Sequence, residues 1–186
     1  MTNRNTRPSL LQSPSIPWKR LGPYLLIFLI VPLATFVVGR HLDRQLGLPP
    51  FPPFPLNLFS GFTVFFSGLA LGVTATRQLY RVGGGLPWGE LDASAQSASL
   101  VTSGVYAVTR NPMTLGYSVL PGGMGLMFQS LSMALLVPTI TLTIMVVWLK
   151  GWEEPRLERR FGAPYRAYQQ RTPFLLPRLA ALLFSD

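Results

Sequence analysis

Four long stretches without a charged residue constrain the fold of this chain more than any other feature. A helix needs about 20 apolar residues to cross the hydrocarbon core of a bilayer. Charged residues make up 12% of the chain, against about 25% in an ordinary soluble domain. We therefore predict an all-α, polytopic membrane protein with about four transmembrane helices. The predicted spans are residues 21–38, 56–75, 113–128 and 131–149.

The basic residues predict the orientation of these spans. The chain carries a net charge of +9, which by itself would suit a nucleic-acid-binding protein. With four spans, however, 14 of the 16 Lys and Arg residues fall on one side, and only Arg40 and Arg44 lie on the other. This asymmetry is the positive-inside pattern, which predicts that both termini are cytoplasmic. We attribute the basic character to topology and expect no nucleic-acid partner.

The chain divides by composition into a tail and one membrane domain. Residues 1–20 are expected to form a cytoplasmic tail, and residues 21–186 a single membrane-embedded domain with its cofactor-binding part at 83–178. The first span has no clear cleavage site after it, so we interpret it as a retained helix. Residues 40–55 are rich in proline and predict a stiff outer connector. We expect no metal site, because the single histidine, His41, has only Asp43 near it as a further ligand.

Small residues on the second span predict close helix packing. Gly68 and Gly72 form a small-xxx-small face, with Gly61 further along the span. We favour a contact with another helix of the same chain over a dimer seam, and the oligomeric state stays open. Gln129-Ser130 leaves room only for a turn, so the last two spans should form an antiparallel helical hairpin. The tail after the last span should stay helical as far as Gly162, which can end a helix.

Residues 100–117 contain the most suggestive polar sequence in the chain. A loop with Thr102, Ser103 and Gly104 precedes Arg110 and Asn111, and Pro112 stands where a helix would begin. The free N–H groups of such a first turn suit an anionic ligand. A polar loop that merely caps a membrane helix is the simpler alternative.

Glu153 and Glu154 form the second suggestive feature. Two carboxylates at the carboxyl end of a helix, near an anionic surface, are unfavourable unless cations meet them. Lys150, Arg156 or Arg159 could supply those cations. The alternative partner is a cationic ligand, and S-adenosylmethionine carries both an ammonium and a sulfonium. Beyond the pair, Tyr165 and Tyr168 with repeated arginines suit an anionic membrane face.

The second half of the chain resembles the isoprenylcysteine carboxyl methyltransferase family and its phospholipid methyltransferase relatives. The resemblance rests on motifs with their order and spacing intact. They are Leu100-Val101, Gly104, Tyr106, Arg110-Asn111-Pro112, Gly116, Glu153-Glu154, and Phe161-Gly162 with Tyr165 and Tyr168.

The resemblance implies a cofactor, S-adenosyl-L-methionine, and a set of residues around it. Glu153 is the first candidate to bind the cofactor and Glu154 the second, and Gly104 of the loop would also contact it. Leu100, Val101 and Tyr106 would line the adenosine side, although plain packing under the loop is the alternative for these three. The other wall would be Asn111, Pro112, Met113 and Thr114. The catalytic candidates are Arg110 and Asn111, and the glycine- and proline-bearing segment 83–87 would fold over the cofactor.

The chain departs from the carboxyl methyltransferases at two positions. Asn111 replaces a histidine and Thr114 a tyrosine, which puts the substrate in doubt more than the cofactor. We expect methyl transfer to a lipophilic acceptor (carboxylate, amine or thiol) that arrives from the bilayer. A phospholipid amine methyltransferase and a non-catalytic scaffold that keeps the fold are the alternatives.

Overall fold

The computed structural model describes residues 18–85 and 96–176, which form helices and loops without a strand. Residues 1–17 of the expected amino-terminal tail lie outside the described residues, and residues 18–20 are helical. Residues 86–87 of the segment predicted to fold over the cofactor, and part of the loop before Leu100, also lie outside the described residues. The chain divides into two units, Met1–Ala34 and Thr35–Asp186. Everything that follows, apart from the first part of helix α1, belongs to the second unit.

Helix α1, Trp18–Gln45, is longer than the first predicted span. Arg40, His41 and Arg44 are therefore helical, and the prediction that a connector begins at residue 40 was wrong. The length of an apolar stretch reflects the thickness of the bilayer. The helix that contains it can extend further, until a residue with a non-helical backbone conformation ends it. Here the stop is Gly47, whose φ of 63° follows the last turn. His41 is exposed, as expected for a solvated residue.

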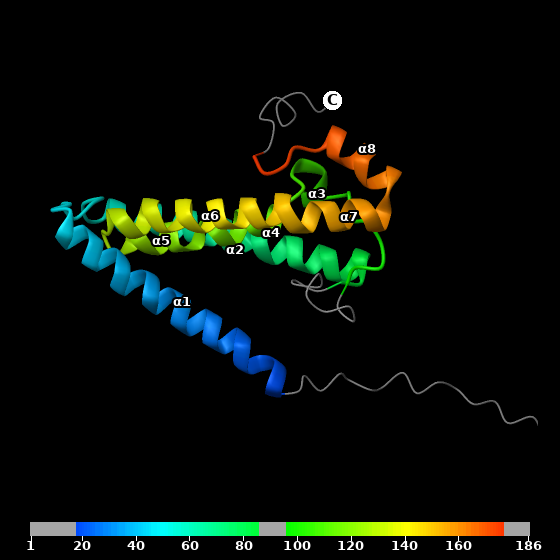
Figure 1. Cartoon of the computed structure of the whole chain (residues 1–186). Helices are drawn as coiled ribbons and strands as arrows, with labels where there is room; N and C mark the ends of the chain where they lie inside the picture. The colour runs from blue at the N-terminus through cyan, green and yellow to red at the C-terminus, as the bar shows by residue number, and fades with distance from the viewer. Residues whose placement is uncertain (1–17, 86–95, 177–186) are drawn as a thin grey trace, which may run out of the picture. The chain divides into compact units, whose positions relative to one another are not determined.

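The glycine face of α2, Leu56–Gln78, packs within the chain, as predicted. Its partners are α4, Pro112–Ser118, and α5, Leu120–Met127, which run antiparallel to it (Figure 1). A Cβ added at Gly68 would lie 2.6 Å from the Gly116 carbonyl oxygen. These small residues let the two backbones touch, which is how helices gain van der Waals contact in lipid.

The third predicted span is broken in the middle. Helix α4 ends at Ser118 and α5 begins at Leu120, with Val119 as the junction. Pro121 explains the break, because its ring has no N–H to bond to the carbonyl of Tyr117 and clashes with it. The prediction that a helix begins at Pro112, one residue before the third predicted span, is confirmed by α4.

The predicted hairpin between the last two spans is confirmed. Gln129 takes a left-handed φ of 53° at the turn, and a Cβ on Gly125 would meet the backbone of Ala134. Asp43 of α1 fixes the start of the returning helix, because its carboxylate accepts a 2.8 Å hydrogen bond from the Ser132 amide. The elements after the turn are η3 (Ser132–Leu136), α6 (Val137–Trp148), η4 (Leu149–Glu153) and α7 (Glu154–Phe161).

The fourth span continues well past its predicted end at residue 149. Helical structure runs without interruption from Ser132 to Phe161 (Figure 1). Its two π-helical turns, η3 and η4, end two residues before Pro138 and Pro155. A widened turn gives the carbonyl groups room where a proline cannot bond to them. The helix then ends at Gly162, with φ 59°, as predicted, and α8, Ala163–Arg171, follows.

The outer surface of this unit suits a lipid environment. Two helical runs of the described residues, Leu56–Gly83 and Ser132–Phe161, are long and apolar enough to cross a membrane. Only 22% of the most apolar window of each is buried, which is low for the core helix of a soluble protein. Large apolar side chains such as Phe59 and Val147 are 77% and 67% exposed. The described helices thus fit a helical membrane protein, and the count of four spans stays a prediction.

Candidate functional site

The loop before α4 is anchored to the end of α2 by one glutamine. Gln78 donates from Nε2 to the Ser103 carbonyl (2.6 Å) and accepts at Oε1 from the Val105 amide (3.2 Å). Gly104 lies between these two residues at φ 54°, and a Cβ there would lie 2.5 Å from the Gln78 amide. The backbone conformation thus favours glycine at 104, and a side chain there would displace the Gln78 amide from these hydrogen bonds. Gln78 was missed by the sequence analysis.

Two of the residues expected on the adenosine side are packed under this loop. Val101 and Tyr106 are buried against Ala75 of α2, with Met113 at the edge of the cluster. The short helix α3, Val105–Val108, brings Tyr106 into this position. The plain-packing alternative therefore describes the side chains of Val101 and Tyr106. Leu100 and Thr114 are half-buried, and Pro112 is fully buried at the start of α4.

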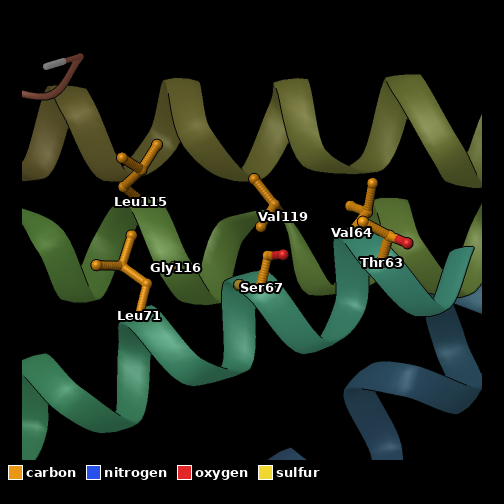
Figure 2. Close-up of a pocket in the computed structure, with 8 residues that line it drawn as sticks. Thr63, Val64, Ser67, Leu71, Leu115, Gly116 and Val119 are labelled. Carbon is orange, nitrogen blue, oxygen red and sulfur yellow. The ribbon is translucent and has the colours of Figure 1, made fainter. Parts of the chain in front are cut away.

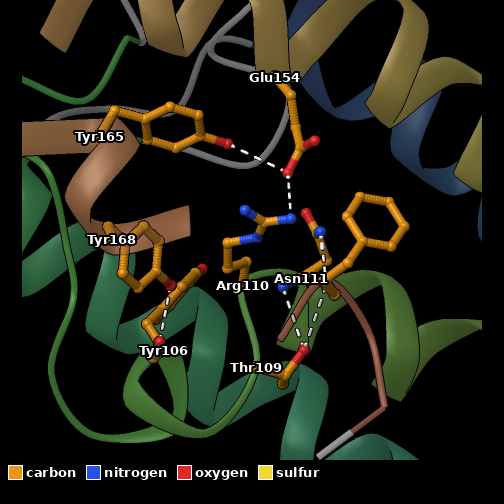
Figure 3. A network of polar contacts seen from close by, with 8 residues as sticks. Tyr106, Thr109, Arg110, Asn111, Glu154, Tyr165 and Tyr168 are labelled. Carbon is orange, nitrogen blue, oxygen red and sulfur yellow. Dashed lines mark hydrogen bonds and ion pairs between the residues drawn. The ribbon is translucent and has the colours of Figure 1, made fainter. Parts of the chain in front are cut away.

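Arg110 and Glu154 form an ion pair at the centre of the polar region. The Arg110 Nη2 and Glu154 Oε1 atoms are 3.0 Å apart, and the side chains are 11% and 15% exposed (Figure 3). The Tyr165 hydroxyl lies 3.4 Å from the same carboxylate oxygen. The loop before α4, the start of α7 and helix α8 thus meet at one point. An ion pair this poorly hydrated is held more tightly than a surface pair.

Arg110 keeps unused hydrogen-bonding capacity. Its Nε is buried and has no hydrogen-bond partner among the described residues. Because guanidinium N–H groups are obligatory donors, this atom suits an additional acceptor. The buried cation is thus able to receive an anionic ligand group without giving up its contact with Glu154.

Tyr165 and Tyr168 are not on a membrane-facing surface. They are 2% and 6% exposed, so the sequence prediction for these two residues was wrong. The Tyr168 hydroxyl donates a 2.6 Å hydrogen bond to the Tyr106 carbonyl and so ties α8 to the loop (Figure 3). Burial raises the pKa of Tyr106, Tyr165 and Tyr168 well above its ordinary value. All three phenols therefore stay protonated at neutral pH.

The structure brings together part of the predicted set. Arg110, Asn111 and Glu154 lie at one polar centre (Figure 3), and Glu153 precedes Glu154 as the last residue of η4. The sequence alternatives for the glutamates were Lys150, Arg156 and Arg159, but the partner of Glu154 is Arg110. Phe174 was missed because it stands in a segment with no helical periodicity. Its ring lies against Arg110 and Lys150.

An open apolar groove lies between α2 and α4. Its volume is about 310 Å³, and Figure 2 shows its walls on α2 and α4. The groove reaches Leu115, whose amide bonds to the Asn111 carbonyl, so it begins one helical turn from the polar centre. The lining residues are Thr63, Val64, Ser67, Gly68, Leu71, Leu115, Gly116 and Val119.

These features define a class of protein, a helical membrane protein with a buried polar site at one end of its helices and an apolar groove beside it. The chain belongs to the phospholipid methyltransferase family, whose model matches residues 56–164. The match covers α2, the loop, the hairpin and α7, including Arg110 and Glu154. It ends before Tyr165, Tyr168 and Phe174. No curated protein and no solved structure matches the chain.

Proposed function

We propose that this protein transfers a methyl group from S-adenosyl-L-methionine to a lipophilic acceptor that reaches the site from the bilayer. The observation that carries the proposal is the buried Arg110–Glu154 pair beside an apolar groove. Membership of the phospholipid methyltransferase family supports methyl transfer on a lipid-related substrate. The acceptor atom and the cofactor site go beyond that support and are our own assignments.

The residues present suit the amino-acid end of this cofactor. Its carboxylate would face Arg110, whose buried Nε has spare donor capacity. Its ammonium would face the carboxylates of Glu154 and Glu153. Leu100, Val101, Gly104 and Tyr106 would shape the adenosine side, with Val101 and Tyr106 contributing mainly backbone, because their side chains are buried. Pro112, Met113 and Thr114 would form the wall toward α4.

When bound, S-adenosyl-L-methionine would supply an electrophilic methyl group, whose carbon an aligned nucleophile can attack while the bond to sulfur breaks and the neutral thioether S-adenosylhomocysteine leaves. The chain's own part is to hold two reactants in line and to keep water away. Tyr106, Tyr165 and Tyr168 contribute buried, neutral surface around the ion pair. Arg110 orients the bound groups and, because its guanidinium does not titrate, takes no proton from the acceptor.

The apolar groove supports an acceptor with a hydrocarbon chain. A chain lying along Leu115 and Val119 would direct its polar head toward Asn111, one turn away. A phospholipid amine is the second candidate acceptor, because the family that matches is the phospholipid methyltransferases. A protonated amine must lose one proton before it can act as the nucleophile, whereas an ionised carboxylate needs to lose none.

A methyl-transfer assay tests this proposal. Purified protein in lipid nanodiscs would be incubated with S-adenosyl-L-methionine labelled in its methyl group, with phosphatidylethanolamine or with a prenylated thiol or carboxylate. With wild-type protein, we expect the methyl label to enter the organic phase for one of these acceptor classes. With the Arg110→Gln variant, we expect no label in the organic phase. A wild-type protein that binds the cofactor but labels none of these lipids would favour the scaffold alternative.

A further inference from the structure

A strap formed by residues 172–176 crosses the loop that carries Arg110. The Arg110 amide donates to the Pro173 carbonyl at 2.9 Å, and the Phe174 carbonyl lies within hydrogen-bond reach of the Thr109 hydroxyl at 3.5 Å. Thr109 and Thr172 are 2% and 6% exposed, so the crossing point is buried. The strap lies beyond the part of the chain that the family model matches.

Asn111 fastens the strap with its side chain. Its Nδ2 donates a 2.8 Å hydrogen bond to the Phe174 carbonyl, the shortest of the three contacts between loop and strap (Figure 3). The backbone amide of Asn111 lies 3.4 Å from the Thr109 hydroxyl. The donor group of Asn111 is thus engaged by the chain itself. Asn111 differs in this respect from its neighbour Arg110, whose Nε has no hydrogen-bond partner among the described residues.

The fastening places the Phe174 ring between two cations. The Arg110 Cζ atom lies 5.6 Å from the ring centroid, and the Lys150 Nζ atom lies 5.0 Å from it. The face of an aromatic ring attracts cations at such distances. Arg110 is therefore held from two directions, by the Phe174 ring and by the Glu154 carboxylate. The direction of its guanidinium depends on the strap being in place.

We propose that Asn111 is a positioning residue that fastens the strap, and that Phe174 is a second positioning residue that directs Arg110 toward the cofactor. The inference rests on the proposed function in one respect, since it assumes that Arg110 meets the cofactor. It assigns Asn111 a role in arranging the site instead of contact with the reacting atoms.

Amide hydrogen exchange on cofactor-free protein tests the fastening. The Arg110 amide is the reporter, because it bonds to the Pro173 carbonyl. Asn111→Asp keeps the size of the side chain but replaces the donor with an oxygen that repels the Phe174 carbonyl. We expect exchange at Arg110 to rise roughly fivefold to tenfold, and trypsin cleavage after Arg171 to rise with it. Unchanged exchange at Arg110 would overturn the fastening role.

Cofactor affinity tests the role of Phe174. In full-length protein, Phe174→Leu should raise the Kd for S-adenosyl-L-methionine roughly threefold to tenfold. Phe174→Tyr should have a Kd close to that of wild type, because it keeps the aromatic ring that faces Arg110. Phe161→Leu is the matched control, since Phe161 also faces a cation, Arg160, at 5.3 Å but does not contact Arg110. Equal Kd values for Phe174→Leu and Phe161→Leu would overturn the role. If wild-type protein bound no cofactor, the proposed function would fail, while the exchange experiment would still decide the fastening.

Discussion

The two adjacent glutamates show how single residues acquire different surroundings at this site. The sequence favours Glu153 over Glu154 as the cofactor ligand, and this ranking stays a prediction; the structure pairs Glu154 with Arg110 at 3.0 Å. Neighbouring residues on a helix point about 100° apart. The π-helical turn Leu149–Glu153 adds a further rotation just before the pair. Sequence alone therefore predicts that a glutamate of this pair meets the site, but not which one.

The buried hydroxyl of Tyr168 is expected to stabilise the end of the molecule that carries the site. Tyr168→Phe removes its 2.6 Å hydrogen bond to the Tyr106 carbonyl and leaves that oxygen without its buried donor. We expect a loss of about 0.5–1.5 kcal/mol, measured as a lower melting temperature in detergent. Tyr80→Phe is the control, because Tyr80 is 59% exposed. Equal melting temperatures for the two variants would contradict the assignment.

The same tyrosines predict how stability depends on pH. Burial raises the pKa of Tyr106, Tyr165 and Tyr168 in the folded state, so these groups resist ionisation there. Unfolded tyrosines ionise near pH 10. The stabilisation is therefore complete below about pH 10 and is lost as the pH rises further. From about pH 8 to about pH 10.5, the melting temperature should fall more in wild-type protein than in Tyr168→Phe. An equal fall in both proteins would contradict a contribution of Tyr168 to this pH dependence.

At the scale of helices, glycine contacts decide how the spans pack. Gly68→Ala would place its Cβ 2.5 Å from a Val119 methyl group and 2.6 Å from the Gly116 carbonyl oxygen, so α2 and α4 would have to separate. We expect a loss of about 1–3 kcal/mol in thermal unfolding. Gly151→Ala is the matched control, because its Cβ would meet no atom within 4 Å. A Gly68→Ala protein as stable as this control would contradict the packing described for α2.

Several elements were predictable because local chemistry specifies them. Pro112 begins α4 and Gly162 ends α7 for backbone reasons that hold in any fold. The break at Val119 and the two π-helical turns follow from prolines, but their position depends on how neighbouring helices accommodate the freed carbonyls. Residues 172–176 have no periodic pattern. Their position over Arg110 arises from tertiary contacts, which sequence periodicity does not report.

At the scale of the whole molecule, the four-span arrangement with both termini in the cytoplasm remains a prediction. It rests on the distribution of basic residues, 14 of which fall on one side of the predicted spans. A reporter fused after Asp186 should be active in the cytoplasm, and one inserted near Pro50 should be active outside. Two reporters on the same side would contradict the three spans predicted between them, and a third reporter at the amino terminus would then locate the error.

The central claim is that the Arg110–Glu154 centre binds S-adenosyl-L-methionine, and calorimetric titration of the cofactor into the purified protein tests it most directly. Wild-type protein should bind, and Glu154→Gln should bind roughly tenfold to a hundredfold more weakly, because a charge-assisted contact is lost. Glu153→Gln, measured in parallel, should show the smaller loss. Tyr80→Phe, at a side chain that is 59% exposed, should bind like wild type. A wild-type protein that binds no cofactor, or a Glu154→Gln variant with unchanged affinity, would contradict the account.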